Sequence, residues 1–361
     1  MTYLDANATE PLRPEARAAL VAALEVTGNP SSVHGAGRAA RRTLESARET
    51  MAARFGGRAG DVVFTAGGTE ADALAVHGLG QGRRVIIGAT EHDAVRAATP
   101  DAVVVPVDRQ GRVDLDRLRA LLAEEPALVC LMHANNETGV LHPIAEAAAL
   151  CRAHGALLHV DAVQSAGRIG ADLAGLGAHS LALSSHKMGG PAGAGALLLS
   201  VEAAAVIAPL IRGGGQERGR RGGTHATAVI AGFAAAAEAC ARTGDLSDLR
   251  DSAERAAIEA GGVAIVAGAD RLPNTAAIAL PGVPAETQVI ALDLAGVAVS
   301  AGAACSSGKV GRSHVLDAMG LGDVAGQTIR VSLAWNTTAA DIAAFADAYR
   351  AVAARLLRRT A

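Results

Sequence analysis

The sequence predicts an α/β fold, in which a large domain has a mostly parallel sheet flanked by helices and a smaller α+β domain follows it. The chain has 361 residues, 50% of them hydrophobic, which is enough to bury one large core and a second, smaller one. Short apolar runs alternate with amphipathic stretches over residues 38–160, as expected for a parallel sheet with helical crossovers. A second alternation begins near residue 241.

The large domain is expected to contain seven strands, each a short β-branched or apolar run. They are residues 61–65, 84–90, 102–107, 127–134, 156–162, 180–187 and 195–200. Between them, residues 71–79 and 144–155 have helical spacing, and the second stretch ends in a glycine stop. Residues 211–223 form an irregular glycine-rich crossing, and the alanine-rich stretch after it is predicted to be a helix.

The second domain is predicted from a new set of apolar runs. Its strands are residues 262–268, 275–280, 297–302 and 328–335, and residues 285–295 form a helix. We therefore expect a large domain over residues 13–240. Residues 1–12 and 241–361 would form the small domain.

Composition excludes several classes of protein. The formal charge of −3 gives no reason to expect attraction to nucleic acid or to an anionic membrane. The opening "MTYLDANATEPL" has no secretory signal pattern, and no apolar stretch is long enough to span a bilayer. The four cysteines have neither paired nor metal-ligand spacing, so we expect no disulfide, no metal and a cytoplasmic protein with reduced thiols.

The first chemical motif is "AGGTEAD" (66–72), which follows a strand and opens a helix. Its glycines and Thr69 would present N–H groups, a hydroxyl and the positive end of the helix to an anion, which is the arrangement of a phosphate site. The alternative is that Thr69 simply caps the helix as part of a capping sequence.

Two charged residues follow other strands of the predicted sheet. Asp161 ends a buried apolar strand, where a carboxylate needs a positive or protonated partner, unless it caps a nearby loop. Lys187 ends another strand just before glycines that allow close approach, where its amine could form a Schiff base, although most lysines are surface residues. A phosphate site, an amine for an aldehyde and a carboxylate for a ring nitrogen together indicate pyridoxal 5′-phosphate.

With these motifs in place, the chain resembles the cysteine desulfurases of the NifS/IscS type, in the class V aminotransferase group of fold type I. The resemblance runs almost end to end. It is carried by "YLDANAT" (3–9), "GNPSSVH" (28–34), "AGGTEAD", "EHDAV" (91–95), "HANNETG" (133–139), "HVDAVQSAG" (159–167), "SSHKMGGPAG" (184–193), "GGGQERGRRGGT" (213–224), "SAGAACSSG" (300–308) and "IRVSLAWNTT" (329–338).

The resemblance implies a role for each matching residue. Lys187 would hold the cofactor, Asp161 would pair with its ring nitrogen, and His92 would stack on the ring and exchange a proton with the substrate thiol. The remaining contacts are Gln164 to the phenolic oxygen, Gly68, Thr69, Ser184 and His186 to the phosphate, Asn136 to cofactor and substrate, and Arg330 to the substrate carboxylate. Thr224 would reach the phosphate in the other subunit, which implies a homodimer with shared active sites.

The family match also explains Cys305, which stands in a run of small residues where a buried structural thiol is the ordinary expectation. In the family, such a cysteine takes the sulfur of L-cysteine as a persulfide, L-alanine leaves, and the sulfur passes to an acceptor protein. Cys130, Cys151 and Cys240 lie in strand or helix patterns and are expected to be structural. The chain ends at "RLLRRTA", shorter than the tail with which IscS-type enzymes meet their scaffold, so the acceptor stays open.

Three alternatives remain at this stage. A selenocysteine lyase or another carbon–sulfur lyase on the same fold would share Lys187 and Asp161. An RNA-binding protein could use the Arg/Gly-rich stretch 212–223, although the chain is acidic and this stretch has no aromatic neighbours. A catalytically silent homologue is disfavoured because every expected catalytic position is filled.

Overall fold

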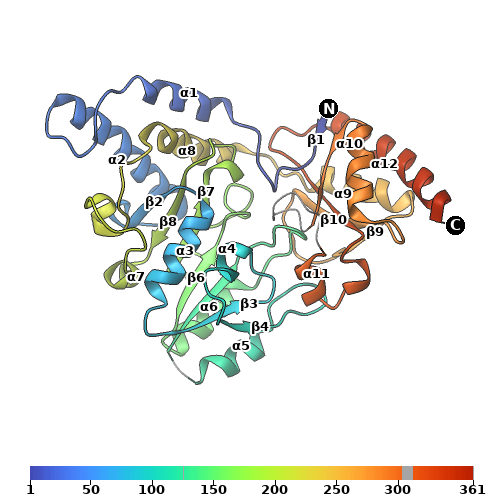
Figure 1. Ribbon diagram of the computed structural model, residues 1–361, viewed down its shortest axis with the longest axis horizontal. Helices are drawn as coiled ribbons and strands as arrows, with labels where there is room; N and C mark the ends of the chain where they lie inside the picture. The colour runs from blue at the N-terminus through green and yellow to red at the C-terminus, as the bar shows by residue number, and fades with distance from the viewer. Residues whose placement is uncertain (125, 303–311, 361) are drawn as a thin grey trace.

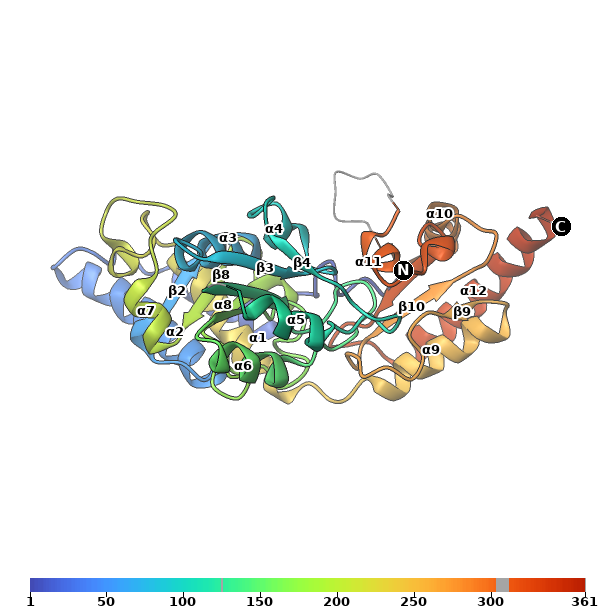
Figure 2. The ribbon, with the colours of Figure 1, turned by 90° about the horizontal axis from the view of Figure 1, so that it is seen from below.

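The computed structural model describes residues 1–124, 126–302 and 312–360. Figures 1 and 2 show an elongated molecule in which a larger lobe carries α1 to α8 and a smaller lobe carries α9 to α12. Among the described residues, none of the helices combines the length and apolar character that a bilayer-spanning segment needs.

The larger lobe is built on a seven-stranded sheet with the order β2-β8-β7-β6-β5-β3-β4. Its strands are β2 (Val62–Thr65), β3 (Arg84–Gly88), β4 (Val103–Val105), β5 (Ala127–Met132), β6 (Leu157–Asp161), β7 (Ser180–Ser184) and β8 (Gly195–Leu199). Neighbouring strands run parallel except at β8, which is antiparallel to both β2 and β7. The prediction of a mostly parallel sheet is confirmed. Its central strands are continuous apolar runs because helices cover both faces.

The helices divide between the two faces of this sheet (Figures 1 and 2). One face is covered through apolar side chains of α2 (Gly35–Phe55), α5 (Leu115–Leu122), α6 (Ile144–Ala153) and α8 (Thr227–Ala239). The other is covered by α3 (Gly68–Leu79), α4 (Asp93–Arg96) and α7 (Val201–Val206). α1 (Pro14–Leu24) lies against α8. This doubly covered sheet places its carboxyl-terminal strand ends at one edge, where an open α/β sheet binds ligands.

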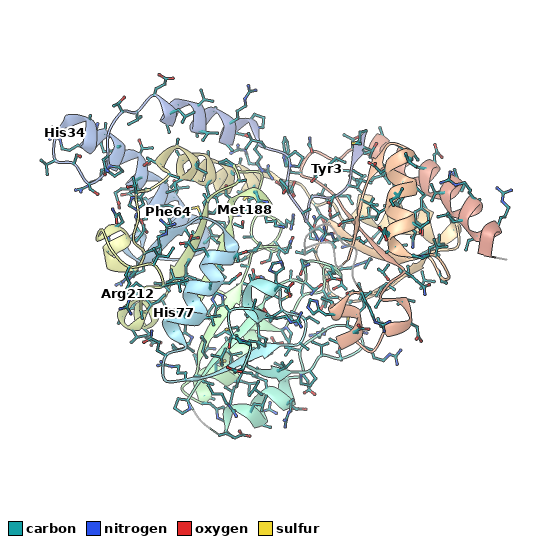
Figure 3. All side chains as sticks on the ribbon, in the orientation of Figure 1. Tyr3, His34, Phe64, His77, Met188 and Arg212 are labelled. Carbon is teal, nitrogen blue, oxygen red and sulfur yellow. The ribbon has the colours of Figure 1, made fainter. Side chains whose placement is uncertain are left out.

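The smaller lobe has its own sheet and core. Its strands are β9 (Val263–Ala264), β10 (Thr275–Ala279), β12 (Ser300–Ala301) and β13 (Thr328–Ser332), all antiparallel, with β1 (Thr2–Tyr3) paired to β11 (Val297–Ala298) beside them. Its helices are α9 (Ser247–Glu259), α10 (Ala285–Leu294), α11 (His314–Ala318) and α12 (Ala339–Thr360). Leu4 is fully buried in this core, and Figure 3 shows Tyr3 beside the same lobe. This packing supports our proposal that residues 1–12 belong with 241–361.

Two predicted strands differ from the structure. Of residues 262–268, only β9 pairs in the sheet; after it the chain turns, and Val266 is buried in a separate cluster with Val140 and Val315. Residues 297–302 form two short strands, because β11 pairs with β1 whereas β12 pairs with β13. In both cases the apolar residues are buried, but against different partners, which a strand pattern alone does not reveal.

A buried ion cluster holds the glycine-rich crossing against the sheet. Arg48 donates to both carboxylate oxygens of Glu217 at 2.7 and 2.8 Å, and the backbone N–H of Phe64 donates to one of them at 2.9 Å. Glu217 and Arg218 have φ values of 48° and 57°, a left-handed conformation that is unfavourable for residues other than glycine. The ion pair therefore holds a strained turn in place.

Replacing Glu217 with Gln is expected to lower the free energy of unfolding by about 3 kcal/mol, because Arg48 would lose its buried counterion. Burial would raise the pKa of Glu217, but hydrogen bonds from Arg48 and His225 outweigh it and lower the pKa to about 2. A carboxyl whose folded pKa is depressed contributes stability above its unfolded pKa, about 4.3, and loses it as the pH falls towards 2. Urea unfolding at neutral and acid pH measures both effects.

Glu45→Gln is the matched control, because Glu45 is a half-buried partner of the same Arg48 at 3.3 Å, whereas Glu217 is buried. We expect it to change stability by less than about 1 kcal/mol. Equal losses in the two variants would contradict a special role for the buried pair.

Candidate active site

A cavity of about 290 Å³ lies at the carboxyl-terminal strand ends of the large sheet. Ten of the twelve residues singled out in the sequence line it: Gly68, Thr69, His92, Asn136, Asp161, Gln164, Ser184, His186, Lys187 and Arg330. They end or follow β2, β3, β5, β6 and β7, except Arg330, which comes from β13 of the smaller lobe. Parallel strands bring their ends to one edge, so residues far apart in the chain meet there.

One wall of the cavity is the turn that opens α3. The helix begins at Gly68, and Glu70 accepts a hydrogen bond from the Ala66 N–H at 2.8 Å, which closes the turn. A Cβ on Gly68 would lie 2.7 Å from Val163, and one on Gly195 would lie 2.4 Å from the Gly67 backbone. Glycine is therefore required on both sides, and the first N–H groups of a twelve-residue helix border the cavity.

Asp161 is the last residue of β6 and is buried. One carboxylate oxygen accepts a hydrogen bond from the Val163 N–H at 2.8 Å. Burial, helped by the charge of Asp72, raises the pKa of Asp161 to about 7, against the pull of that hydrogen bond. A cationic group at this position would restore its charged form.

The Lys187 amine is held by the N-terminal segment. Its Nζ donates to the carbonyl oxygens of Asn7 at 2.5 Å and Ala8 at 3.0 Å. Next to it, Nδ1 of His186 lies 3.0 Å from the Thr9 hydroxyl. Residues 7–9 therefore hold both side chains, Asn7 lines the cavity, and two backbone dipoles orient the amine.

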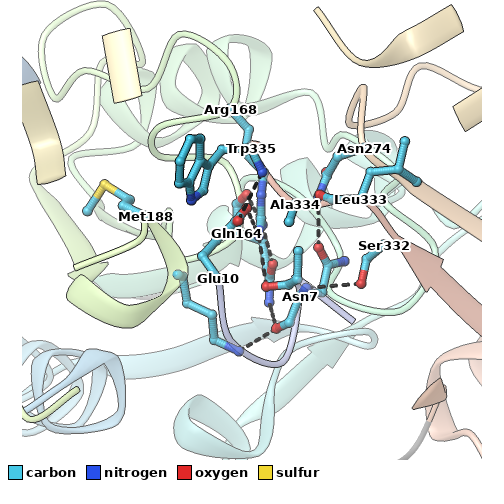
Figure 4. A network of polar contacts seen from close by, with 12 residues as sticks. Asn7, Glu10, Gln164, Arg168, Met188, Asn274, Ser332, Leu333, Ala334 and Trp335 are labelled. Atoms are coloured by element: carbon cyan, nitrogen blue, oxygen red, sulfur yellow. Dashed lines mark hydrogen bonds and ion pairs between the residues drawn. The ribbon is translucent and has the colours of Figure 1, made fainter. Parts of the chain in front are cut away.

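A polar network fixes this N-terminal segment between the lobes (Figure 4). Gln164 donates to the Asn7 carbonyl at 3.0 Å, while its own side-chain oxygen accepts from Arg168 at 2.5 Å. On the other side, Asn274 donates to the Asn7 side chain at 3.2 Å, and the Asn7 N–H donates to the Ser332 hydroxyl at 3.0 Å. Asn7 thus joins both lobes at the cavity.

Arg330 reaches the cavity from the smaller lobe and is almost fully buried. Its guanidinium donates to Asp5 at 2.7 Å and to the Asn136 carbonyl at 3.0 Å. Its buried Nε has no hydrogen-bond partner among the described residues. A buried donor without a partner costs free energy, so an anionic group in the cavity would be favourable here.

His92 stands at the start of α4 and has a defined tautomer when neutral. Its Nδ1 accepts a hydrogen bond from the Ala94 N–H at 3.1 Å, so the ring proton is on Nε2. The histidine is thereby oriented by the backbone of its own helix and borders the cavity.

Two predicted residues are not in this cavity. Thr224 is exposed and does not line it, in keeping with a residue whose expected contact is with another subunit. Cys305 lies outside the described residues. Cys130, Cys151 and Cys240 are buried, and burial raises the pKa of each thiol, that of Cys151 to about 12.

Comparison with protein families matches residues 2–345 to the aminotransferase class V family. The chain belongs to this family. A cysteine desulfurase of Cereibacter sphaeroides is 44% identical over 360 residues, which cover 94% of this chain and 92% of the relative. Among solved structures, a NifS-like protein from Rickettsia africae has a TM-score of 0.90 at 34% identity and covers 98% of this chain and 99% of its own. The structure of SspA in complex with cysteine has a TM-score of 0.83 at 26% identity, covering 94% and 100%.

Pyridoxal 5′-phosphate is the cofactor of this class V aminotransferase family, and the cavity of this member fits it. The glycine-lined start of α3 suits a phosphate, the raised pKa of the buried Asp161 suits a protonated ring nitrogen, and Lys187 supplies an amine for the aldehyde. The cavity volume is close to the lower end of the range for small-molecule sites. In the described part of the chain, no group of three or more His, Cys, Asp or Glu side chains could hold a metal ion.

Two polar residues of this class V aminotransferase site were not among those predicted from the sequence. Asn7 and Asp72 both line the cavity. Each stands inside a motif that was noticed, "YLDANAT" and "AGGTEAD", but neither motif shows which residue faces the cavity. Helical spacing was the available signal for Asp72, which lies one turn after Gly68 and therefore on the same face of α3.

Proposed function

We propose that this protein is a cysteine desulfurase, which uses pyridoxal phosphate to convert L-cysteine into L-alanine and a persulfide on Cys305. The observation that supports this proposal best is the cavity itself. The Lys187 amine, the Asp161 carboxylate, the N-terminal turn of α3 and the Arg330 guanidinium all line it. The cysteine desulfurase names of its relatives and the cysteine complex of SspA support the same substrate.

The roles of the residues follow from their positions. Bound pyridoxal phosphate supplies an aldehyde that captures amines and a ring that withdraws electrons from the attached carbon. Lys187 would hold the cofactor and, when released, keep its amine at the carbonyls of Asn7 and Ala8. Arg330 would bind the substrate carboxylate beside Asn136. His92 would exchange a proton at Nε2 with the substrate thiol.

Cys305 would take the sulfur atom. The other three cysteines are buried with raised thiol pKa values, which keeps them protonated. The described residues on either side of Cys305 contact Glu137, which follows the cavity residue Asn136: a Cβ on Gly302 would come 2.5 Å from Glu137, and Ser313 donates to Glu137 at 2.5 Å. In the transfer, the Cys305 thiolate would form a sulfur–sulfur bond as the carbon–sulfur bond of the substrate breaks. The electron pair of the broken bond would stay with the methylene carbon, which takes up one proton to become the methyl group of alanine.

We infer that the enzyme acts as a homodimer with shared active sites. Thr224 is exposed outside its own cavity, and an apolar groove of Tyr3, Pro11, Leu12, Pro191 and Ala192 lies next to the cavity residue His186. A second copy of the chain would cover such a surface. Sedimentation equilibrium of the purified chain tests this, and a concentration-independent monomer would contradict it.

The sulfur on Cys305 would pass to an acceptor protein in a reducing compartment such as the cytoplasm, since the reaction needs a free thiol.

The contacts of the Arg/Gly-rich stretch argue against the RNA-binding alternative. Arg218 and Arg220 donate to the Gly60 carbonyl at 2.6 and 3.0 Å, and Arg221 pairs with Glu70 at 2.7 Å. These guanidinium groups bind the protein's own backbone and side chains.

The deciding experiment incubates the protein, loaded with pyridoxal phosphate, with L-cysteine and dithiothreitol. It follows the absorbance of the bound cofactor together with sulfide and alanine. Equimolar sulfide and alanine are expected. Bound cofactor without either product would contradict the proposed reaction, whereas failure to bind the cofactor would contradict the assignment of the cavity.

Arg330→Lys is expected to raise the KM for L-cysteine about tenfold or more, because a lysine cannot form the paired hydrogen bonds of a guanidinium with a carboxylate. Arg312→Lys is the matched control, since Arg312 forms an exposed ion pair with Asp317. Steady-state kinetics of both variants measure the effect. An unchanged KM in Arg330→Lys would remove this residue from substrate binding.

A further inference from the structure

A second carboxylate lies in the cavity and has no part in the roles given above. Asp72, in the second turn of α3, lines the cavity and is 1% exposed. One of its oxygens lies 3.1 Å from Nε2 of His159. His159 is completely buried in β6, and its Nδ1 lies 2.8 Å from the Ser180 hydroxyl.

These contacts define the proton positions. An ionised carboxylate only accepts hydrogen bonds, so when Asp72 is charged, Nε2 of His159 carries a proton and donates it to Asp72. Burial lowers the pKa of His159 to about 4, which keeps the ring neutral near pH 7. Nδ1 is then an acceptor, and Ser180 donates to it. His159 therefore orients the ionised Asp72 carboxylate through a neutral ring.

Asp72 and Asp161 share this side of the cavity. His159 and Asp161 are two residues apart on β6, so both side chains are on the face that α3 covers. Burial raises the pKa of both carboxyls to about 7, and the charge of Asp72 adds to the effect on Asp161. The other titratable groups that interact with Asp72 are Glu91, which precedes α4, His92 at the start of α4, and Cys130 of β5. Of these groups, His159 and His92 are bases, and burial keeps the His159 ring neutral near pH 7, so His92 is the one that could balance a carboxylate charge.

We propose that Asp72, oriented by His159, is a second carboxylate of the cofactor site, and that it helps Asp161 to bind a protonated ring nitrogen. The inference rests on the proposed use of pyridoxal phosphate. Two carboxylates on one wall of the cavity repel each other. A cation bound between them removes this repulsion, so a ring that is protonated on nitrogen would be stabilised by attraction to both charges. His159 and Ser180 are positioning residues, since they act through Asp72.

The test compares the affinity of the apoprotein for pyridoxal phosphate and for its deaza analogue, in which a carbon replaces the ring nitrogen. The ratio of the two dissociation constants reports how strongly the site favours the nitrogen. We expect Asp72→Asn to lower this preference about tenfold, because it would weaken the binding of pyridoxal phosphate and leave the binding of the analogue unchanged. If Asp72 had only a structural role, the substitution would weaken the binding of both ligands equally, and that result would overturn the proposal.

Asp93→Asn is the matched control, because it removes one charge near the same cavity from an exposed ion pair with Arg96. Its ratio should equal that of the native chain. These affinities involve no turnover, so they separate this inference from the proposed reaction: a protein that passes this test but releases no sulfide would contradict only the desulfurase function.

A second measurement covers the case in which Asp72→Asn does not fold. Nitrogen NMR of the native protein with labelled histidine reports the tautomer of His159. We expect a neutral ring with its proton on Nε2 at neutral pH when the cofactor is bound, because the bound cation keeps Asp72 ionised. A proton on Nδ1 alone, or a charged ring, would overturn the proposed orientation of Asp72.

Discussion

Lys187→Ala is expected to lower sulfide release by about 10³-fold or more, since it removes the amine that would hold the cofactor covalently. The sequence contains two lysines, Lys187 and Lys309, and only Lys187 belongs to the cavity as the structure describes it. Borohydride reduction of the loaded protein, followed by mass spectrometry of its peptides, identifies the attached lysine. The label should appear on the peptide that contains Lys187.

Lys309→Ala is the control for this result, because it removes the other lysine and should leave the attachment unchanged. A label on Lys309, or covalent attachment that survives in Lys187→Ala, would contradict the assignment. Loss of the attachment with full turnover would show instead that the cofactor link is not required for the reaction.

Cys305→Ser is expected to reduce sulfide release by about 10³-fold or more, while the absorbance of the bound cofactor stays unchanged. A serine hydroxyl at this position cannot carry the transferred sulfur, and the remaining thiols are buried with raised pKa values. Sulfide assays and absorbance spectra on the same sample separate loss of transfer from loss of cofactor.

Cys240→Ala is the matched control, since it removes a buried thiol whose Sγ donates to the Ala237 carbonyl of the preceding helix α8 at 3.1 Å. The Cys240→Ala variant should retain its turnover at any temperature at which the variant is folded. Full activity of Cys305→Ser would contradict the persulfide step. Loss of activity in Cys240→Ala alone would indicate that Cys240, and not Cys305, accepts the sulfur.

The sequence by itself determined the large sheet and the chemistry at its edge. Continuous apolar runs such as 127–134 are visible because a strand covered on both faces has no polar side. The "AGGTEAD" turn, Asp161 and Lys187 each follow such a run, so sequence order places them at one edge of the sheet. The family resemblance supplied the remaining residues, of which all but Thr224 and Cys305 line the same cavity.

Only the tertiary structure decided which distant residues orient these groups. Nothing in the sequence near Lys187 predicts that the carbonyls of Asn7 and Ala8 hold its amine, some 180 residues away. The pairing of Asp72 with His159 is equally invisible, because residues 87 positions apart meet only when α3 packs on β6. The physical reason is that periodicity reports which side of an element is buried, whereas partners across the core depend on how the elements pack.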